Sequence, residues 1–386
     1  MSESHHVLGR LPSLLRAAGY SADFLAARLG IRVPDDVGQL NHAPTLERLL
    51  GDRTHAATLT RLFFLETDEA AARVFDQPIR HQLRRAGLLS QRAGRMRARL
   101  RLDPIGSHWL LSDRRFRSPD ARALHLPKGD PVYPPSSDSL LLRDATVHRD
   151  AGAGLDLCTG SGVQALAVAR NSRHVIAVDV SPRAAAMTRA NATLNGLGNV
   201  DVRVGDLYRP VAGERFDVII ANPPFVPSPY RQGPAYHSGG PTGARVLQRI
   251  VTGVGNALEA DGRFFAVSHL ALRGNETVAD VIRPWWRGFR GRVLVLVLES
   301  GSAIDLAAAQ SLFALAGGFA AYAAEVRRWV AYLHRHGVRE VVLLLLVAEC
   351  GSRVDFEVTT AFQRTLPLPL SHPPRHHVEQ WLARAH

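Results

Sequence analysis

From about Leu155 onward, short apolar runs alternate with longer segments, and this alternation constrains the fold more than any other feature. Each apolar run has the length of a buried strand, and most of the segments between them have helical spacing. The pattern therefore predicts an α/β fold, in which helices wrap a parallel sheet. We expect seven strands, at 155–159, 174–179, 200–205, 216–221, 263–268, 292–298 and 338–348.

The first part of the chain follows other periods. Residues 8–90 carry apolar positions at helical spacing, whereas Arg95–Leu102 alternates strictly between arginines and apolar residues. Asp103–Gly106 reads as a turn, and the residues after it read as a return strand. Helices followed by a basic hairpin suggest a winged-helix-like module. We therefore expect two domains, a helical, winged-helix-like accessory domain at 1–126 and the α/β domain at 127–386.

The run LDLCTGSG leads from the first expected strand through Gly160 and Gly162 into a helix. Glycine at these positions lets the loop turn tightly and lets a ligand approach the backbone. The next two strands end on Asp179 and Asp206, which could bind ribose hydroxyls and an adenine amino group. Both NAD and S-adenosylmethionine (SAM) fit these features, because Ala165 could serve as the third small residue of an NAD loop.

The fourth strand stops at Asn222, which Pro223, Pro224 and Phe225 follow in the run FDVIIANPPF. This run resembles the motif of amino-directed, SAM-dependent class I methyltransferases. The motif suits the methylation of an amide or aromatic amine nitrogen. Such a nitrogen is a weak nucleophile, because its lone pair is delocalised. The Asn222 side-chain oxygen and the Pro223 carbonyl can accept both N–H hydrogens, which turns the lone pair toward the methyl donor. The prolines hold that carbonyl rigidly, and Phe225 can stack on a flat acceptor.

Residues 130–300 as a whole resemble the small-domain methyltransferases. This group includes release-factor glutamine-N5 methyltransferases, ribosomal RNA guanine-N2 methyltransferases and some DNA adenine methyltransferases. The resemblance rests on LDLCTGSG, AVDVSPRAAAMTRANATLNG, VGDLY, FDVIIANPPF and HSGGPTGARVL, in that order. It implies a Rossmann-like seven-stranded class I sheet, SAM as cofactor, S-adenosylhomocysteine as product, and no metal. The segment YPPSSDSLLL is expected to close over SAM from the N-terminal side.

The resemblance also implies a role for each matched position. Asp156 and the glycine loop would hold the methionine portion of SAM, Asp179 the ribose, and Asp206 with Leu207 the adenine. The expected cofactor-binding residues are Asp156, Cys158, Thr159, Gly160, Gly162, Asp179, Val180, Asp206, Leu207 and Asn222. The expected catalytic residues are Asn222, Pro223, Pro224 and Phe225. The expected substrate-binding residues are Tyr133, Phe225, Tyr230 and His237.

Two features depart from the family pattern. Cys158 stands where glycine is commoner, and a small buried thiol there is expected to be inert packing. A helical insertion at about 303–336 lies between the sixth and seventh strands, where relatives usually have a short connection. The sixth strand of a parallel sheet ends on the ligand side, so the insertion should cap and narrow the substrate pocket. The N-terminal module matches no motif of the glutamine-methyltransferase accessory domain.

The chain is strongly basic, with a formal net charge of +12. Only Lys128 is a lysine among 47 basic residues, so we attribute the basicity to codon usage rather than to one binding patch. Arginines alternate with apolar residues in the expected hairpin and could follow nucleic-acid phosphates. We favour a solvated or ion-paired face, because arginine fills nearly every basic position of this chain. The arginines in question are Arg95, Arg97, Arg99 and Arg101.

Other classes of protein are less compatible with the sequence. No apolar run approaches the roughly 20 residues of a membrane span, and the N-terminus has no signal-peptide pattern. Cys158 and Cys350 lie far apart and give neither a disulfide framework nor a metal-ligand spacing. His372, His376 and His377 lack a cysteine or acid that would complete a metal site. We expect a cytoplasmic protein with no membrane partner, and a homodimer is one option for its assembly.

Three functions remain open at this point. The first is an N-methyltransferase that acts on an amide or amine nitrogen of a protein or nucleic acid. The second is a small-molecule methyltransferase of secondary metabolism, whose pocket the helical insertion closes. The third is a nucleic-acid-binding regulator with a vestigial SAM site. The first predicts that Arg95/Arg97/Arg99/Arg101 to Glu changes weaken macromolecule binding, and the second predicts a deep closed cavity.

Overall fold

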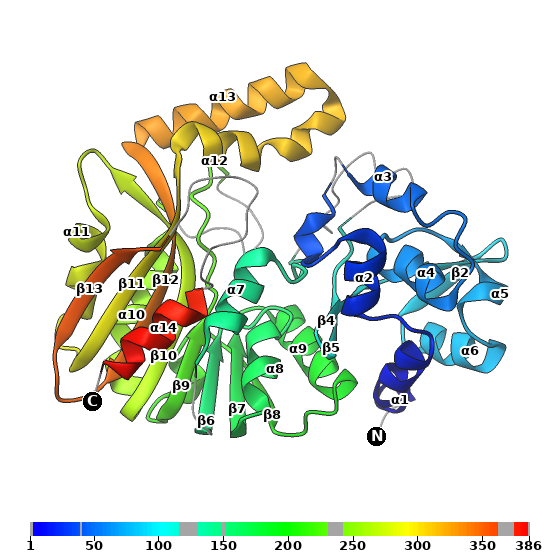
Figure 1. Cartoon of the computed structure of the whole chain (residues 1–386), viewed down its shortest axis with the longest axis horizontal. Helices are drawn as coiled ribbons and strands as arrows, with labels where there is room; N and C mark the ends of the chain where they lie inside the picture. Colours follow the sequence, from blue (N-terminus) through cyan, green and yellow to red (C-terminus); the bar gives the residue numbers. More distant parts are fainter. Residues whose placement is uncertain are drawn as a thin grey trace.

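The computed structural model describes residues 3–38, 41–115, 130–147, 151–230, 242–361 and 374–384. A large sheet with helices on both faces forms one part of the molecule, and a smaller N-terminal module lies beside it (Figure 1). The large part confirms the predicted α/β class, because strands and helices alternate along the chain from residue 151.

The central sheet has eight strands in the order β13-β11-β12-β10-β9-β6-β7-β8. Only β12 runs against its neighbours, because it pairs antiparallel with β10 and β11 whereas all other pairs are parallel. The strands are β6 (Ala151–Leu157), β7 (Ser172–Asp179), β8 (Val200–Val204), β9 (Phe216–Ala221), β10 (Leu258–Arg273), β11 (Gly291–Ser302), β12 (Val338–Cys350) and β13 (Asp355–Thr360).

The expectation of seven strands was wrong by one, because β13 adds an eighth strand at the edge beside β11. Four of the six residues of its sequence, DFEVTT, are polar, and its side chains are only partly buried or exposed. An edge strand has one neighbour and needs no continuous apolar run, so a search for buried strands does not find it.

Helices cover both faces of the sheet. Residues of α7, α8, α9 and α14 pack into one apolar core, and residues of α10 and α11 pack into another on the opposite face. These helices are α7 (Ser137–Ala145), α8 (Val163–Ala169), α9 (Pro182–Leu194), α10 (Arg245–Ala257), α11 (Val278–Ile282) and α14 (Pro374–Ala383), with short turns η3 (Arg209–Val211) and η4 (Arg283–Trp286). Helix α9 begins at Pro182, where the side chain of the preceding Ser181 accepts a hydrogen bond from the Ala184 N–H.

The N-terminal module contains six helices and two small sheets in its described residues. Its helices are α1 (Glu3–Ala17), α2 (Ala22–Leu29), α3 (His42–Glu47), α4 (His55–Leu59), α5 (Ala71–Val74) and α6 (Gln77–Arg85), with short turns η1 (Pro34–Asp36) and η2 (Thr60–Phe64). One sheet has the order β1-β3-β2, and the other pairs β4 with β5. These strands are β1 (Glu69–Ala70), β2 (Leu89–Arg92), β3 (Arg95–Ala98), β4 (Arg101–Ile105) and β5 (His108–Ser112). The winged-helix-like character of this module stays a prediction.

The expected hairpin at 95–113 is replaced by two hairpins. The chain pairs β3 with the preceding β2, and it then starts β4 at Arg101. Strand β4 continues through Asp103, Pro104 and Ile105, and the turn follows at Gly106. Asp103 and Pro104 therefore belong to the strand and not to the turn. The break before β4 shifts the alternation, and Arg101 is fully buried instead of sharing an exposed face with Arg95.

Buried acids explain the position of Arg101. Its guanidinium lies 2.8 Å from the Asp103 carboxylate and 3.5 Å from that of Glu66, and all three side chains are inaccessible to solvent. Arg101 Nη1 also donates to the Phe64 carbonyl at 2.7 Å. Burial of a charge requires such partners, so this arginine is part of the module's interior.

The module packs on α9 of the sheet domain. Asn191 of α9 bonds the backbone of Leu111 in both directions, at 2.7 and 2.9 Å, and Asn195 bonds the backbone of Trp109 in the same way. Arg183 at the start of α9 pairs with Asp113. The predicted boundary between 1–126 and 127–386 lies outside the described ranges and stays a prediction.

The segment between β11 and β12 is helical, as the sequence indicates. It contains α12 (Ala303–Gln310), η5 (Leu312–Gly317) and α13 (Phe319–Arg335), which lie over one edge of the sheet (Figure 1). Trp329 and Leu333 of α13 form an apolar cluster with Val226, which follows β9. The insertion therefore contacts the loop that carries Asn-Pro-Pro-Phe.

Candidate active site

The carboxyl ends of three neighbouring strands are aligned. In the sheet register Ala221 of β9 is the neighbour of Leu157 in β6, and Leu157 is the neighbour of Val178 in β7. Adjacent strands lie about 4.8 Å apart. The next residue in each strand direction is Cys158 after β6, Asp179 at the end of β7 and Asn222 after β9. These three residues therefore lie in a row at the carboxyl ends of the strands, where open α/β sheets bind ligands.

The glycine loop after β6 requires its glycines. Gly162 has a φ of +88°, and a Cβ at this position would meet Thr188 at 3.0 Å and Leu166 at 3.1 Å. Gly160 has a φ of +57°, but no described atom lies within 4 Å of its Cβ position. Gly162 thus lets helix α9 pack closely, whereas Gly160 leaves open space where a ligand could approach the backbone.

Asp156 is buried beneath the loop and braces it. Its Oδ2 accepts hydrogen bonds from Thr159 Oγ1 at 2.5 Å and from the Ala165 N–H at 3.0 Å. Its Oδ1 is buried and has no partner among the described residues. Burial raises the pKa of the Asp156 carboxyl to about 7, against the lowering effect of these two hydrogen bonds. Asp156 Oδ2 thus holds the glycine loop in place, and Oδ1 is left to bind another polar group.

Asp179 links the end of β7 to the glycine loop. Its Oδ2 accepts from the Gly160 N–H and its Oδ1 from the Ser181 N–H, both at 2.9 Å. Burial raises the pKa of Asp179, while the two N–H donors lower it. The side chain of the next residue, Val180, is 60% exposed. A carboxylate and an exposed apolar side chain therefore stand side by side at this strand end.

Asp206 and Leu207 follow β8. Asp206 is ion-paired with Arg249 of α10 at 2.6 Å, and this hydrogen bond is the main cause that lowers the pKa of the Asp206 carboxyl. Leu207 is buried and has a φ of +50°. An adenine amino group bound to Asp206 would share the carboxylate with Arg249.

Cys158 occupies the position where the resemblance leads one to expect glycine. Its φ is +61°, in the left-handed region that favours glycine. Burial, followed by the charge of Asp179, raises the pKa of the Cys158 thiol well above its ordinary value. The thiol is therefore neutral at physiological pH, which agrees with an inert packing role.

Asn222 is held by the first turn of α7. Its Nδ2 donates to Asp138 Oδ2 at 2.9 Å and to Ser139 Oγ at 3.2 Å. Pro223 is buried, and the ring of Phe225 meets His269 edge-on with 4.6 Å between centroids. The segment YPPSSDSLLL thus contacts the Asn-Pro-Pro-Phe motif through Asp138 and Ser139.

Several residues of this region do not stand out in the sequence. Asp138 and Ser139 lie in a segment that we quoted only as a whole, and His269 lies near the end of β10. Gly243 lies close to the Asn-Pro-Pro-Phe motif, because a Cβ at this position would lie 2.0 Å from the Phe225 carbonyl oxygen. Its φ of +79° also favours glycine. The sequence does point to Gly243, because this glycine belongs to HSGGPTGARVL, one of the runs that resemble the methyltransferase family.

The expected substrate residues have different surroundings. The Arg115 guanidinium lies 5.7 Å from the centre of the Tyr133 ring. The Tyr230 hydroxyl donates to Glu325 of α13, which raises the pKa of Tyr230 in addition to the effect of burial. His237 lies outside the described residues.

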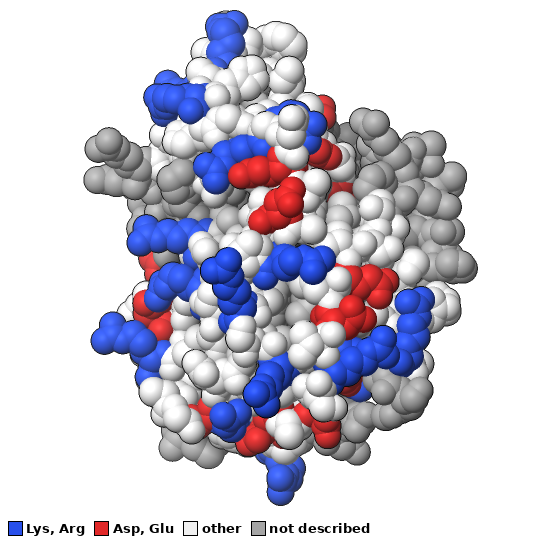
Figure 2. All heavy atoms as spheres, turned by 90° about the vertical axis from the view of Figure 1, so that its left-hand side faces the viewer, with Lys and Arg blue, Asp and Glu red and all other residues white. Residues whose placement is uncertain are grey.

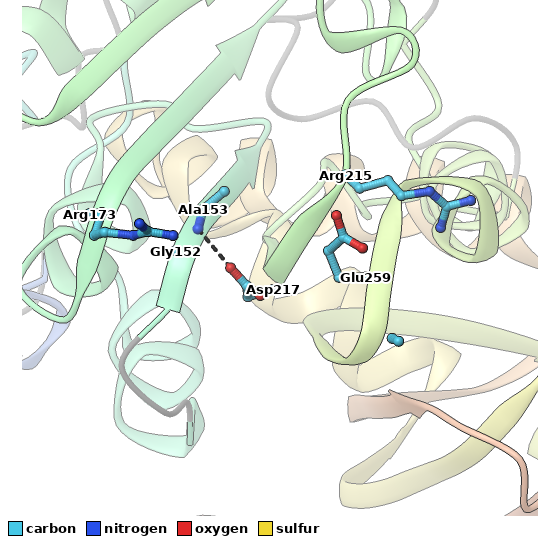
Figure 3. A pocket seen from close by; sticks show the side chains of 7 residues that line it. Gly152, Ala153, Arg173, Arg215, Asp217 and Glu259 are labelled. Carbon is cyan, nitrogen blue, oxygen red and sulfur yellow. Dashed lines mark hydrogen bonds between the residues drawn. The ribbon is translucent and has the colours of Figure 1, made fainter.

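A polar depression lies at the opposite edge of the sheet. It has a volume of about 470 Å³ and is lined by charged side chains that include Arg173, Arg215 and Glu259 (Figure 3). Asp217, at the start of β9, accepts a hydrogen bond there from the Ala153 N–H at 2.8 Å. Because it lies at the amino ends of the strands, this depression is separate from Asn222.

A family model described as "Methyltransferase small domain" matches residues 136–285, which contain the whole row of strand ends. The sequence is 30% identical over 159 residues to the "Putative protein N5-glutamine methyltransferase" of Methanocaldococcus jannaschii, and the match covers 40% of this chain and 79% of that protein. The chain belongs to the small-domain family of SAM-dependent methyltransferases. This confirms the resemblance on which the expected roles rest.

Other glutamine methyltransferases match over a smaller share of their own length. The release factor glutamine methyltransferase of Thermodesulfovibrio yellowstonii is 29% identical over 168 residues, which are 38% of this chain and 60% of that protein. The ribosomal protein uL3 glutamine methyltransferase of Burkholderia pseudomallei is 37% identical over 130 residues, with coverages of 29% and 42%. The match to release-factor enzymes of Xylella fastidiosa spans only 26% of their length.

A solved structure of the same enzyme class is also similar. The 16S rRNA N2 G1207 methyltransferase of T. thermophilus, in complex with AdoMet and guanosine, has 20% sequence identity and a TM-score of 0.36, and covers 55% of this chain and 57% of that one. Within the described ranges this small-domain methyltransferase has no cluster of three or more potential metal ligands. None of its described helices has the length and apolar content needed to cross a membrane.

Proposed function

We propose that this chain binds SAM along the row of strand ends and directs methyl transfer to an amide or amine nitrogen held by Asn222. The observation that supports this most strongly is the orientation of the Asn222 side chain. Its Nδ2 is occupied by Asp138 and Ser139, and no described residue bonds its Oδ1. The side-chain oxygen is therefore available to accept an N–H from an acceptor molecule.

The residues at the strand ends fit SAM. Gly160 leaves open space at the loop, Asp179 offers carboxylate oxygens for ribose hydroxyls, and exposed Val180 offers an apolar surface for adenine. The buried Oδ1 of Asp156 is unpartnered and could accept a bond from a cationic amino group. When bound, SAM supplies an activated methyl group, and these residues would hold it.

The acceptor nitrogen needs orientation more than it needs a base. Asn222 Oδ1 and the Pro223 carbonyl would take its two hydrogens, and the pair of prolines limits movement of that carbonyl. Phe225, supported edge-on by His269, would form a wall for a flat amide or base. Alignment of well-positioned reactants can lower a barrier by about 7–11 kcal/mol. The proton can leave the nitrogen after methyl transfer, so no general base is required.

A macromolecular amide is the first candidate for the acceptor. The relatives named above are described as glutamine methyltransferases of release factors or of a ribosomal protein. We extend only the chemistry of that acceptor, a carboxamide nitrogen, to this chain. A nucleobase amino group has the same two hydrogens and stays the alternative within this class. Either acceptor would place the reaction in the cytoplasm.

A small-molecule acceptor is the second candidate, and a specific contact favours it. Tyr230, five residues beyond Phe225, bonds Glu325 of α13, and Val226 packs against Trp329 of the same helix. The insertion thus restricts access to the motif from one side. A metabolite would tolerate this restriction better than a folded protein would.

Methyl transfer from tritiated SAM distinguishes these candidates. The purified full chain is incubated separately with bacterial protein, with total RNA and with a metabolite extract, in parallel with Asn222→Ala protein. Label that enters one pool only with the wild-type chain identifies the acceptor class. Label that enters no pool, although SAM binds, would contradict an active enzyme and favour the regulator with a vestigial SAM site.

A further inference from the structure

Positive charge is concentrated in one stretch of the N-terminal module. Residues 71–99 contain eight arginines and one acid, Asp76, so 29 residues carry +7 of the chain's net +12. We define the basic surface as the exposed arginines of α5, α6, the hairpin β2–β3 and the residue after it. They are Arg73, Arg84, Arg85, Arg92, Arg95, Arg97 and Arg99.

Few acids neutralise the basic surface. Arg97 pairs with Asp68 at 2.7 Å, and Arg95 donates to the Asp68 backbone carbonyl. Within the described chain, no carboxylate lies within ion-pair distance of four others, Arg73, Arg84, Arg92 and Arg99. Arginines and acids are instead intermixed on the side of the molecule that carries β13 and α11 (Figure 2). Codon usage explains the choice of arginine over lysine, but it does not explain this uneven distribution.

The elements beneath the basic surface hold it as one unit. Helix α6 buries Ile79 and Leu83 and exposes Arg84. Arg84 Nη1 donates to Gln91 Oε1 of the hairpin at 3.2 Å, which joins helix and hairpin. The only Phe, Tyr or Trp of 71–99 is Phe75, and it is buried. The exposed imidazole of His81 is therefore the one ring of this stretch on which an unpaired base could stack.

We propose that the basic surface binds duplex nucleic acid through its phosphates. Guanidinium groups form paired hydrogen bonds with phosphate oxygens, and each contact releases counterions from the duplex. A single exposed ring, that of His81, offers little area for stacking, which favours a duplex over a single strand. This binding does not depend on methyl transfer, so it would bring the enzyme to nucleic acid whether or not a base is the methyl acceptor.

Fluorescence anisotropy with labelled 20-base-pair RNA and DNA duplexes tests this proposal at several salt concentrations. The test variant is Arg84→Glu/Arg92→Glu/Arg99→Glu. The control is Arg287→Glu/Arg290→Glu/Arg353→Glu, which changes the net charge equally at exposed arginines elsewhere. Melting temperatures of both variants establish that they are folded, and the two duplexes show whether RNA or DNA is the source of the phosphates.

The test variant should bind about 100-fold more weakly at low salt, and its slope of log K against log salt should be smaller by about 3, because three phosphate contacts are lost. The duplex affinity of the control variant should stay within about threefold of wild type, because only the overall electrostatic attraction to the duplex changes. Equal losses in both variants, or no duplex binding by the wild-type chain, would overturn the proposal. Stronger binding of acidic polypeptides than of duplexes would do so too.

A second inference concerns Asp138 and rests on the proposed function. An ionised carboxylate only accepts hydrogen bonds, so the Asn222 atom 2.9 Å from Asp138 Oδ2 must be the amide nitrogen. Without this partner the amide could rotate and present either atom to the acceptor. We infer that Asp138 is a positioning residue that keeps Asn222 Oδ1 directed toward the acceptor nitrogen.

The surroundings of Asp138 hold it in place. Ser136 Oγ donates to its other carboxylate oxygen, and the Ser137 N–H donates to Asp35 of the N-terminal module at 2.7 Å. Gln164 of α8 donates to the Ser139 carbonyl at 2.7 Å. The first turn of α7 is therefore fixed from both the N-terminal module and the sheet domain.

Kinetics of Asp138→Ala test this role, with Asp144→Ala as the matched control. Asp144 lies on the same helix, is exposed, and is ion-paired only with neighbouring Arg143 among the described residues. Asp138→Ala should lower kcat about 30-fold and leave the Kd for SAM within about twofold, and Asp138→Asn should recover part of the loss, since its side-chain oxygen can still accept. Asp144→Ala should resemble wild type.

Two outcomes separate this inference from the proposed function. Full kcat in Asp138→Ala, together with an inactive Asn222→Ala, would overturn the positioning role and leave the proposed function standing. Full activity in Asn222→Ala would instead contradict the proposed function itself. A parallel rise in the Kd for SAM in Asp138→Ala would also overturn the positioning role, because it would indicate general damage to the site.

Discussion

Asp179 Oδ2 accepts a hydrogen bond from the Gly160 N–H at 2.9 Å, so the carboxylate that ends β7 and the glycine loop after β6 form one unit. The second carboxylate oxygen accepts from the Ser181 N–H at the start of α9. Removal of this carboxylate would both free the loop and delete a partner for ribose hydroxyls.

Asp179→Ala should therefore weaken SAM binding by about 1.5–3 kcal/mol, the range for hydrogen bonds to a charged group. Calorimetric titration measures this effect. Asp201→Ala is a suitable control, because Asp201 lies in the neighbouring strand β8 and is half-buried in an ion pair with Arg203. An unchanged dissociation constant for Asp179→Ala would remove this residue from the cofactor site.

Asn222→Ala should abolish turnover and leave the affinity for SAM nearly intact, because we propose that the lost oxygen accepts a hydrogen bond from the acceptor nitrogen rather than from the cofactor. The two quantities are measured by tritium transfer and by calorimetry on the same preparation. A comparable loss of both would contradict the role proposed for Asn222.

Gly243→Ala should lower turnover by about 100-fold, because a displacement near 1 Å in a reacting group can have that effect. A Cβ at this position would meet the Phe225 carbonyl oxygen at 2.0 Å and displace the motif. Gly213→Ala is the matched control, since Gly213 has a similar φ of +82° but no described atom within 4 Å of its Cβ position. If both variants lose activity equally, backbone strain rather than the contact with Phe225 would be responsible.

Asp156 should make the free energy of unfolding depend on pH. Its folded-state pKa is raised from 3.8 to about 7, so between these values the folded chain holds a proton that the unfolded chain releases. The stabilising contribution is thus complete below about pH 4 and is lost as the pH rises through 7, with a total on the order of 4 kcal/mol.

Asp156→Asn mimics the neutral carboxyl at every pH and keeps an oxygen for Thr159 and Ala165. Relative to wild type, this variant should become more stable as the pH rises from 5 to 8. Urea unfolding at four pH values in that interval measures the difference. A difference that stays constant would mean that Asp156 does not titrate in this interval.

Much of the candidate site could be predicted from sequence because its residues follow apolar runs directly. A parallel sheet brings the carboxyl ends of its strands to one edge, so Asp179 and Asn222 are placed by the strands that precede them. The glycines of the loop were recognisable for a similar reason, since Gly162 must be small to let α9 pack.

Other parts depend on contacts between distant segments. Asp138 acts through a contact with Asn222, 84 residues away, which no local pattern records. Arg101 belongs to a regular alternation in the sequence, yet the chain breaks before it and buried Glu66 and Asp103 enclose it. The edge strand β13 is too polar to resemble a buried strand. In each case tertiary packing overrides the local pattern.

Calorimetric titration of the purified full chain with SAM tests the central claim most directly. The residues at the ends of β6, β7 and β8 should give saturable heat with one binding site per chain, and S-adenosylhomocysteine should compete for it. No heat with either compound would contradict a cofactor site at this edge and, with it, the transfer of a methyl group to a nitrogen at Asn222.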